Sequence, residues 1–345
     1  MTAGTRTGLR AEAIPRPRIG LVLGGGGVVG QAYHAGALAA LEHDLGWDPR
    51  TAAVIVGTSA GSLAGHALRS GVPAGGLAAW AVDAPLWGRT AELAASAGPR
   101  PEFPPMRLLD LVRPGRLPGP RMLTRAARAP WRIRPTTLAL VLARAGSHRL
   151  DDHLEMLAAL PTAWPEAPLW VTAVRRADGA RVVFGHEGAP GASPAAALAA
   201  SCAVPGYFAP ARIDGVDYVD GGTHSPTNAD LLRRSDVDLV VVISPMSAGS
   251  APGWALHGGV RRFAGRRLHR EVGGLLASGR SVLVLQPRRD VLRAMGSDLM
   301  AGAVVTDVVR EAFLDTGAQL READGGVRAL LSAPDDDRGA LAAPA

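Results

Sequence analysis

The N-terminal part of the chain contains two apolar runs, each followed by a glycine-rich turn and then by a helical pattern. Arg18–Gly24 is mainly apolar and ends in glycine, and Ala37 and Leu41 follow at helical spacing. Ala52–Val56 is a second apolar run, and the helix after it ends at Gly71. Two strand–turn–helix units in close succession predict a parallel sheet covered by helices, and hence an α/β fold.

The later part of the chain continues this alternation of strands and helices. The run Arg181–Gly185 follows a turn at Ala177–Gly179 and predicts the return strand of a hairpin. Ser193 and Pro194 mark a helix start, with serine as N-cap and proline in the first turn. Asp298–Glu322 has one apolar face and predicts a long helix. Further apolar runs predict strands at Pro168–Val174, Asp238–Ser244 and Ser281–Pro287.

Residues 84–150 interrupt the pattern with proline and with eleven arginines between Arg100 and Arg149. Two interpretations stay open: an inserted helical subdomain whose arginines face water, or a lid that touches lipid head groups with arginine and acyl chains with apolar side chains. The apolar residues among these arginines are Phe103, Met106, Leu108, Leu109, Leu111, Leu117, Met122, Leu123, Trp131 and Ile133. No nucleic-acid motif is present, and nucleic acid is not expected as a partner.

Composition narrows the class of protein. The chain has 345 residues, 47% of them apolar, which is enough for a substantial core. Its formal charge is +6, and every cation is arginine because the sequence contains no lysine. Cys202 is the single cysteine, which excludes an internal disulfide and a cysteine-cluster metal site. The N-terminus has no apolar signal region and no apolar run is long enough to span a membrane, so a cytoplasmic location with peripheral membrane contact left open is expected.

The first glycine turn fits two different chemistries. Gly25, Gly27 and Gly30 have the G-x-G-x-x-G spacing of a dinucleotide-binding turn, but the same amides also suit an oxyanion. A dinucleotide site needs an acidic residue at the end of the second strand, and that strand ends in Val54–Ser59 without one. A phosphate loop of the Walker type needs lysine. Oxyanion stabilisation is therefore the favoured interpretation.

The second glycine turn, Gly57–Gly61, reads G-x-S-x-G and places Ser59 between a strand and a helix. Such a turn exposes a serine hydroxyl at the edge of a sheet, near the positive end of a helix. A serine nucleophile needs a base, and Asp220 in Asp220–Gly222 is the candidate, after a hairpin-like stretch. An Asp-Gly pair also simply closes turns, which is the interpretation for Asp214-Gly215.

Three features in this order resemble the motifs of patatin-like phospholipases: the glycine turn with Gly25 to Gly30, the serine turn Gly57–Gly61 and the aspartate motif Asp220–Gly222. The segments Ala200–Pro210 and Ser225–Asp230 are similar to sequence near that family's aspartate. The resemblance covers Ile19–Ile243 well and the C-terminal third loosely. It implies a three-layer α/β/α sandwich with a mainly parallel central sheet and an inserted helical, arginine-rich lid region. The expected organisation is an extension at 1–17, the main domain at 18–323 with its insertion at about 84–150, and a flexible tail at 324–345.

The resemblance also implies the activity and the site. It indicates a serine acyl-ester hydrolase acting on lipids, of phospholipase A or lysophospholipase type, with no metal and no cofactor. Ser59 would be the nucleophile and Asp220 its base, and a carboxyl must be desolvated to have a raised pKa and act as a base near neutral pH. The amides of Gly25, Gly26, Gly27 and Val28 would form the oxyanion hole, and the motif glycines are Gly30, Gly57, Gly61, Gly221 and Gly222.

One residue departs from the family pattern, and three rival functions stay open. Val29 stands where the family usually carries Arg or Lys, which makes a strict preference for phospholipids less certain. An α/β-hydrolase triad would need a histidine after the acid, and His224, His257 and His269 follow Asp220. The second rival is an acyltransferase on the same scaffold, and the third is a non-catalytic module that binds anionic membranes. The oligomeric state is unknown.

Overall fold

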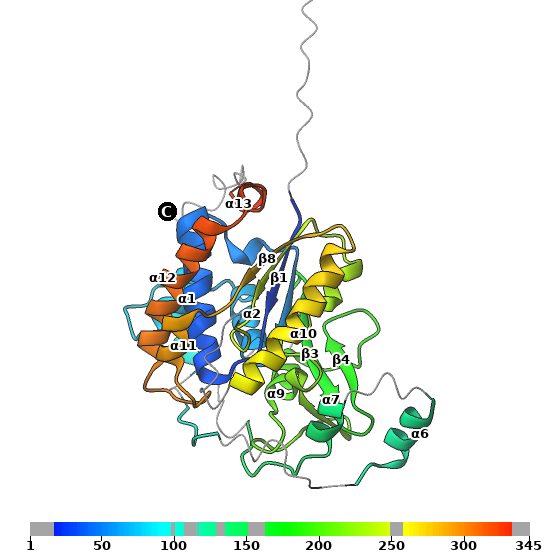
Figure 1. Ribbon diagram of the computed structural model, residues 1–345. Coiled ribbons are helices and arrows are strands. Elements are labelled where there is room, and N and C mark those ends of the chain that lie inside the picture. The colour runs from blue at the N-terminus through cyan, green and yellow to red at the C-terminus, as the bar shows by residue number, and fades with distance from the viewer. Residues whose placement is uncertain are drawn as a thin grey trace, which may run out of the picture.

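The computed structural model describes residues 17–97, 101–106, 115, 117–128, 135–150, 163–248 and 258–332. A single mixed sheet forms the middle of three layers (Figure 1). Its order is β5-β6-β3-β2-β1-β7-β8, and β4 also pairs with β3. The strands are β1 (Ile19–Leu23), β2 (Val54–Thr58), β3 (Leu169–Arg175), β4 (Ala180–Phe184), β5 (Ala211–Ile213), β6 (Val216–Asp220), β7 (Leu239–Ile243) and β8 (Ser281–Leu285).

The five strands β3, β2, β1, β7 and β8 are parallel neighbours, β4 and β6 pair antiparallel with β3, and β5 pairs antiparallel with β6. The predicted parallel sheet and the β3–β4 hairpin are thus confirmed. Strand β2 extends two residues beyond the predicted run, to Thr58, because Gly57 continues the ladder opposite Leu23 of β1. Every residue of β1, β2 and β7 is buried, as expected for parallel strands covered on both faces.

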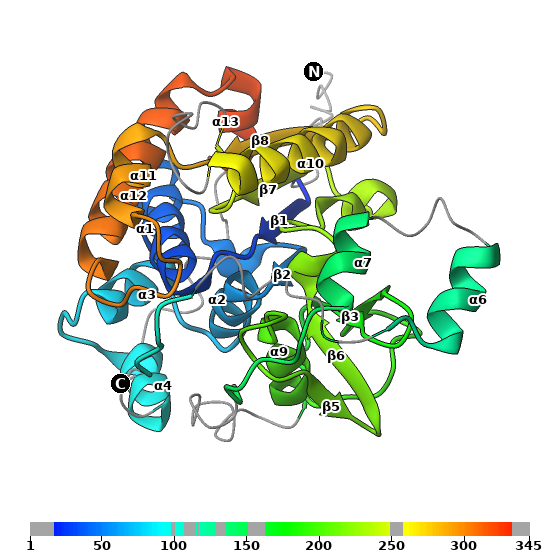
Figure 2. The ribbon, with the colours of Figure 1, turned by 60° about the horizontal axis from the view of Figure 1, so that its bottom comes forward.

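Helices cover both faces of the sheet (Figure 2). On one side α1 and α12 pack together over the sheet, with α2, α3 and α11 beside them, and on the other side lies α10. The helices are α1 (Gly27–Leu45), α2 (Ala60–Arg69), α3 (Ala74–Ala81), α4 (Gly88–Ala97), α6 (Pro120–Arg128), α7 (Pro135–Val141), α9 (Pro194–Cys202), α10 (Gly258–Leu276), α11 (Arg289–Met295), α12 (Val305–Glu322) and α13 (Gly325–Leu331). The 3-10 helices are η1 (Pro49–Thr51), η3 (Gly221–Thr223) and η4 (Ala229–Arg234).

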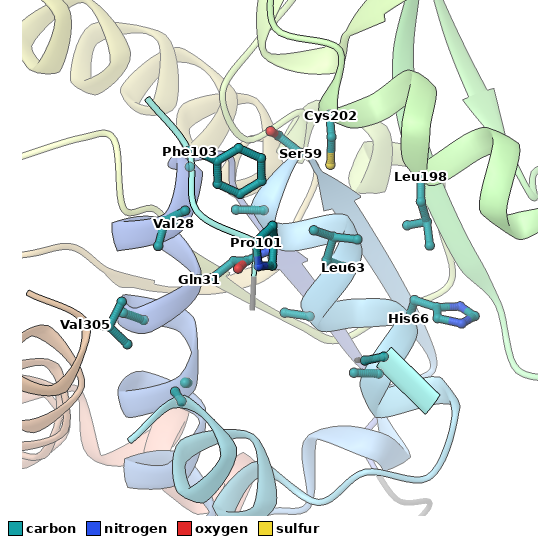
Figure 3. Close-up of a pocket in the computed structure, with 18 of the residues that line it drawn as sticks. Val28, Gln31, Ser59, Leu63, His66, Pro101, Phe103, Leu198, Cys202 and Val305 are labelled. Carbon is teal, nitrogen blue, oxygen red and sulfur yellow. The ribbon is translucent and has the colours of Figure 1, made fainter. Parts of the chain in front are cut away.

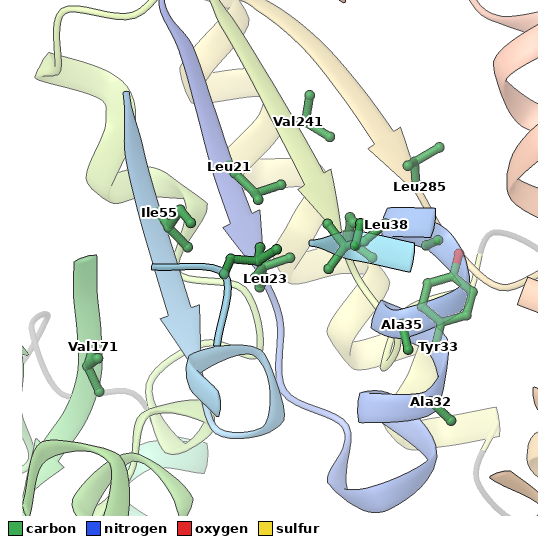
Figure 4. Packing of buried hydrophobic residues seen from close by; sticks show 14 of the residues in the cluster. Leu21, Leu23, Ala32, Tyr33, Ala35, Leu38, Ile55, Val171, Val241 and Leu285 are labelled. Atoms are coloured by element: carbon green, nitrogen blue, oxygen red, sulfur yellow. The ribbon is translucent and has the colours of Figure 1, made fainter. Parts of the chain in front are cut away.

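Alternation along each strand divides the core in two. Leu21 and Leu23 of β1 belong to the cluster that includes α1 and α12, whereas Val22 belongs to the cluster that includes Leu268 of α10. Figure 4 shows the first of these clusters, with Leu21, Leu23 and Leu38. Helix α1 is buried over most of its length, so its sequence is apolar on nearly every face. A side chain at Gly36 would overlap the Val309 carbonyl oxygen of α12, which explains the small residues of this helix pair.

Two helix expectations need correction. The long helix predicted from Asp298 begins only at Val305, because the Asp298 carboxylate accepts hydrogen bonds from the amides of Met106 and Met300 and stabilises a turn. The stretch expected as a tail begins with α13, capped by the Asp324 side chain and anchored by buried Leu331. The N-cap role of Ser193, which accepts from the Ala196 amide, is confirmed.

The described part of the arginine-rich insertion consists mainly of α4, α6 and α7. Met122 of α6 is buried in a small cluster with Val174 of β3 and Val219 of β6. Thr137 of α7 donates a hydrogen bond of 2.9 Å to the carbonyl oxygen of Thr223, which follows the aspartate motif. Five of the apolar residues noted in the insertion lie outside the described residues: Leu108, Leu109, Leu111, Trp131 and Ile133. Within the described ranges, no helix is both long and apolar enough to cross a membrane.

Candidate active site

The sheet brings the ends of β2 and β6 together along one strand. Thr58, the last residue of β2, pairs with Thr172 of β3, and Asp220, the last residue of β6, pairs with the next residue, Ala173. Strand β2 runs parallel to β3 and β6 runs antiparallel to it, so the two strands approach each other end to end. The residue after Thr58 is Ser59. Topology thus brings the predicted nucleophile, one residue beyond Thr58, and the predicted base to the same part of β3, although the two are far apart in the sequence.

The serine turn has a strained backbone at the serine itself. Ser59 has φ 51° and ψ −123°, a region that residues other than glycine rarely occupy. The flanking glycines serve close approach: a side chain at Gly57 would lie against Ser62, and one at Gly61 would overlap the Leu23 carbonyl oxygen. Helix α2 therefore starts directly against β1 and β2. Its N-terminus, with its partial positive charge, begins at Ala60 beside the serine.

Two serines hold Ser59 in this conformation. The Ser59 amide donates to the Ser201 hydroxyl of α9 at 2.9 Å, and Ser201 is fully buried. The Ser59 carbonyl oxygen accepts from the amide and the hydroxyl of Ser62, at 2.8 and 2.7 Å. Ser59 is itself buried, with 7% of its surface exposed. The backbone on both sides of its Cα is thus anchored.

Asp220 is buried and has one carboxylate oxygen without a partner. Oδ1 accepts the Gly222 amide at 2.6 Å, and Oδ2 has no hydrogen-bond partner among the described residues. Burial raises the pKa of the carboxyl to about 6, although interactions with the Ser59 side chain and the Gly222 amide lower it. Gly221 fits tightly, because a side chain there would overlap Thr172. Such a carboxylate is a proton acceptor suited to neutral pH.

The first glycine turn offers fewer amides than the sequence suggests. The Gly25 amide donates to the Pro226 carbonyl oxygen at 2.8 Å, so it is not available to an oxyanion. Among the described hydrogen bonds, the amides of Gly26, Gly27 and Val28 have no acceptor, as expected at the start of α1. Gly27 has φ 64°, and a side chain there would lie 2.5 Å from the Leu299 carbonyl oxygen. By contrast, a side chain at Gly30 would make only ordinary contacts, the nearest at 3.6 Å.

Two buried residues of α1, His34 and Val29, lie next to this turn. His34 is fully buried, and its Nε2 donates to the Gly24 carbonyl oxygen at 2.7 Å. Burial lowers the pKa of His34 to about 4, so the ring is neutral at physiological pH. Val29, which replaces the basic residue of the family pattern, is 1% exposed and packs in the core. A cation at that position would have to be accommodated among apolar side chains.

An apolar cavity of about 240 Å³ opens beside Ser59 (Figure 3). Its walls come from α1, α2, α3, α4 and α9 and from residues 101 and 103 of the insertion. Val28, whose amide is one of the free donors, lies on the α1 side, and Leu63 on the α2 side. No charged residue lines the cavity within the described ranges, because His66, which is part of the wall, has its pKa lowered to about 4 by burial. The cavity suits an uncharged, apolar group.

Asn228 is a site residue that the sequence did not single out. It is fully buried with φ 53°, and its Nδ2 donates to Ser225 O at 2.7 Å, to Thr58 Oγ1 at 3.1 Å and to Thr172 Oγ1 at 3.2 Å. The Asn228 side chain thus links Thr58, the residue before the predicted nucleophile, to Thr172 of β3. The signal that could have found it is the similarity of its segment, Ser225–Asp230, to sequence of the family.

The other candidates of the sequence lie elsewhere or serve other contacts. His224 has an electrostatic interaction with Asp230, whose pKa it helps to lower, although the Arg181 side chain contributes more. His269 is exposed on α10, and His257 lies outside the described residues. Cys202 is buried at the cavity wall, and burial raises the pKa of its thiol. No group of three or more His, Cys, Asp or Glu side chains suited to a metal ion occurs in the described part of the chain.

One known family matches the part of the chain that contains these residues. The model of the family described as patatin-like phospholipase matches residues 21–233, which contain the glycine turn, the serine turn and the aspartate motif. The chain therefore belongs to the patatin-like phospholipase family, a family of lipid acyl hydrolases. A comparison with curated proteins gives no match.

Proposed function

We propose that the chain hydrolyses lipid acyl esters through a Ser59–Asp220 dyad, as a phospholipase A or lysophospholipase. The observation that carries this proposal is the meeting of β2 and β6 along β3: Thr58 and Asp220 pair with successive residues of that strand, and Ser59 directly follows Thr58. The apolar cavity beside Ser59 supports an acyl chain as the bound group. Uncharged walls favour the hydrocarbon part of a lipid over an ionised substrate.

In the proposed reaction, Asp220 Oδ2 takes the proton from Ser59 Oγ as the oxygen attacks the ester carbonyl. Negative charge develops on the carbonyl oxygen, and the free amides of Gly26, Gly27 and Val28 donate to it. Each preorganised donor of this kind contributes about 3 kcal/mol. The N-termini of α1 and α2 add their partial positive charge to the same region.

Collapse of the tetrahedral intermediate breaks the ester bond, and Asp220 returns its proton to the leaving alcohol or lysophospholipid. A water molecule then attacks the acyl-enzyme with Asp220 as its base, which releases the fatty acid and restores Ser59. The proposed oxyanion hole contains three amides instead of the four expected from the sequence, because the Gly25 amide already donates to the Pro226 carbonyl oxygen. Replacement of water by another alcohol in the last step would make the enzyme an acyltransferase.

The test is hydrolysis of p-nitrophenyl esters of increasing acyl length by wild type, Ser59→Ala, Asp220→Asn and His224→Ala, without added metal. The proposal expects activity to fall at least a thousandfold in the first two variants and to stay within threefold in His224→Ala. An equal loss in His224→Ala would indicate a triad in place of the dyad. Lysophospholipid and diacyl phospholipid substrates then separate the two subtypes.

Peripheral contact with an anionic membrane through the arginine-rich insertion is part of the same proposal. The insertion contributes α4, Pro101 and Phe103 to the cavity wall, and its helix α6 packs against β3 and against β6, the strand that ends at Asp220. A lipid drawn from a membrane would therefore meet the insertion on its way to Ser59. Vesicle binding tests this contact separately from catalysis.

A further inference from the structure

A second cleft, of about 590 Å³, lies between α6 and the β3–β4 hairpin. Four arginines line it: Arg121, Arg125 and Arg128 of α6, and Arg175 at the end of β3. The three on α6 follow one another at four- and three-residue spacing, so they share one face of the helix. The lining includes a single carboxylate, Asp178, and no aromatic ring among the described residues.

The carboxylate is already satisfied within the hairpin. Asp178 accepts two hydrogen bonds from Arg175, at 3.0 and 2.7 Å, and a third from the Ala180 amide at 3.0 Å. Arg125 reaches across the cleft to the Asp178 carbonyl oxygen at 3.1 Å. In the described part of the chain, none of the three α6 arginines forms an ion pair with a carboxylate. The cleft therefore has an excess of positive charge that an anion would neutralise.

The cleft also lies at the functional edge of the sheet. Arg175 is three residues beyond Thr172, the partner of Thr58, and lies roughly 10 Å further along β3. It is thus at the C-terminal end of β3, the same edge of the sheet at which β2 ends before Ser59. Helix α6 is anchored there by Met122, which packs with Val219, the residue before Asp220. Leu117, close to the start of α6, is 86% exposed. An anionic ligand in the cleft would thus be held at the sheet edge where β2 and β6 end, on the face of the sheet opposite the apolar cavity.

We propose that this arginine cleft binds the phosphate group of anionic lipid head groups and holds the enzyme at a membrane surface by the edge of the sheet at which Ser59 and Asp220 lie. Guanidinium groups bind phosphate oxygens in pairs, and basic residues near an anionic membrane each add to the affinity. An exposed leucine and the absence of aromatic rings in the described lining favour a lipid surface over single-stranded nucleic acid, which needs stacking platforms. This inference deepens the membrane contact proposed above, and it does not depend on which ester Ser59 cleaves.

The experiment measures binding in a Ser59→Ala background, so that the vesicles are not consumed. Flotation with phosphatidylglycerol vesicles and with phosphatidylcholine vesicles is compared for the intact cleft and for R121Q/R125Q/R128Q. The matched control is R262Q/R266Q/R270Q, which removes three exposed arginines from one face of α10 and changes the net charge equally. The proposal expects a tenfold to hundredfold loss of phosphatidylglycerol affinity in the cleft variant and less than threefold in the control.

A single-residue variant and an activity control complete the experiment. R128Q alone, at a residue with no described hydrogen bond, should lose roughly threefold to tenfold and guards against misfolding of the triple variant. With Ser59 intact, the cleft variant should hydrolyse soluble p-nitrophenyl esters within twofold of wild type, and this arm alone fails if the proposed function is wrong. Equal loss in the α10 control, binding of inorganic phosphate without vesicle binding, or preference for an oligonucleotide over the vesicles would each overturn the proposal.

Discussion

The two strand–turn–helix units at the centre of the sheet have the same topology but use their turns in opposite ways. Strands β1 and β2 are neighbours in register, with Leu23 opposite Gly57, and each leads directly into a helix. In the β2 turn the positive φ falls on Ser59 and the backbone groups around it are bonded. In the β1 turn the positive φ falls on Gly27 and three consecutive amides have no acceptor among the described hydrogen bonds. One turn fixes a side chain, and the other leaves its backbone available.

The difference shows that a glycine motif can have two distinct physical causes. Gly61 is required because no atom fits between α2 and β1, whereas Gly27 combines a left-handed conformation with a close carbonyl oxygen. Gly30 belongs to the motif by spacing, but a methyl group there would meet nothing closer than 3.6 Å. Substitutions at these positions can therefore distinguish glycines required for packing from glycines required for catalysis.

The largest effect is expected from Gly61→Ala. Its methyl group would overlap the Leu23 carbonyl oxygen, a backbone atom that cannot move without displacing β1. We expect a loss of more than about 3 kcal/mol in the free energy of unfolding, measured by urea denaturation. Gly30→Ala is the matched control in the other turn, and we expect it to be neutral or slightly stabilising because it removes a glycine from a helix. Equal destabilisation by the two would remove the contrast between the turns.

The pH dependence of activity should follow Asp220, the proposed base for Ser59. With a pKa of about 6, the carboxyl is protonated in acid and cannot accept a proton, so kcat/KM should rise roughly tenfold per pH unit up to pH 6 and then level off. A profile that stays flat between pH 4 and 7 on a soluble ester would exclude Asp220 as the base.

The same pKa has a consequence for stability. Because the folded pKa is raised above the ordinary value, the contribution of Asp220 to stability is present below about pH 4 and is lost as the pH rises through about 6. The loss is roughly 3 kcal/mol. Asp220→Asn should therefore gain stability relative to wild type as the pH is raised from 4 to 7, in denaturation measurements at both values.

A smaller effect is expected from Ser201→Ala, which removes the acceptor of the Ser59 amide. A buried donor without a partner costs about 1–3 kcal/mol, and a less firmly held nucleophile should lower kcat roughly tenfold. KM should change little, because Ser201 does not line the cavity. Ser201→Thr keeps a hydroxyl and should recover part of kcat. A change in KM with kcat intact would assign Ser201 to substrate binding.

The smallest effect compares Ser59→Gly with Ser59→Ala. Neither variant has a nucleophile, but glycine tolerates φ 51° and alanine does not, so the glycine variant should be more stable by about 1 kcal/mol. Thermal or urea denaturation measures this difference. Equal stability of the two variants would mean that the serine turn stores no strain.

Local sequence patterns predicted much of the fold and part of the site. The strands, the serine turn and the helix start at Ser193 follow from apolar periodicity and from glycine or capping residues that act on their immediate neighbours. The helix after Asp298 was predicted too long, because the Asp298 side chain accepts from Met106, almost two hundred residues earlier in the sequence. Periodicity within a segment contains no information on such a contact.

The same limit applies at the site. The roles of Ser59 and Asp220 were predicted from motifs, but the residues that hold them act over long sequence separations: Ser201 on the Ser59 amide and Asn228 on Thr58. The availability of the Gly25 amide was also beyond local reasoning, since the acceptor that occupies it belongs to Pro226. The hydrogen-bond partner of a buried polar group is often far away in the sequence. It can be identified only when the arrangement of the strands and helices is known.

The end-to-end meeting of β2 and β6 along β3 has a consequence for synthesis of the chain on the ribosome. Ser59 emerges early, but the base proposed for it, Asp220, is the last residue of a strand that emerges 161 positions later, when β6 can pair with β3. A nascent chain therefore contains the serine turn before it contains the buried carboxylate. Under the proposed mechanism, acyl transfer to Ser59 begins only after the greater part of the domain has left the ribosome and folded.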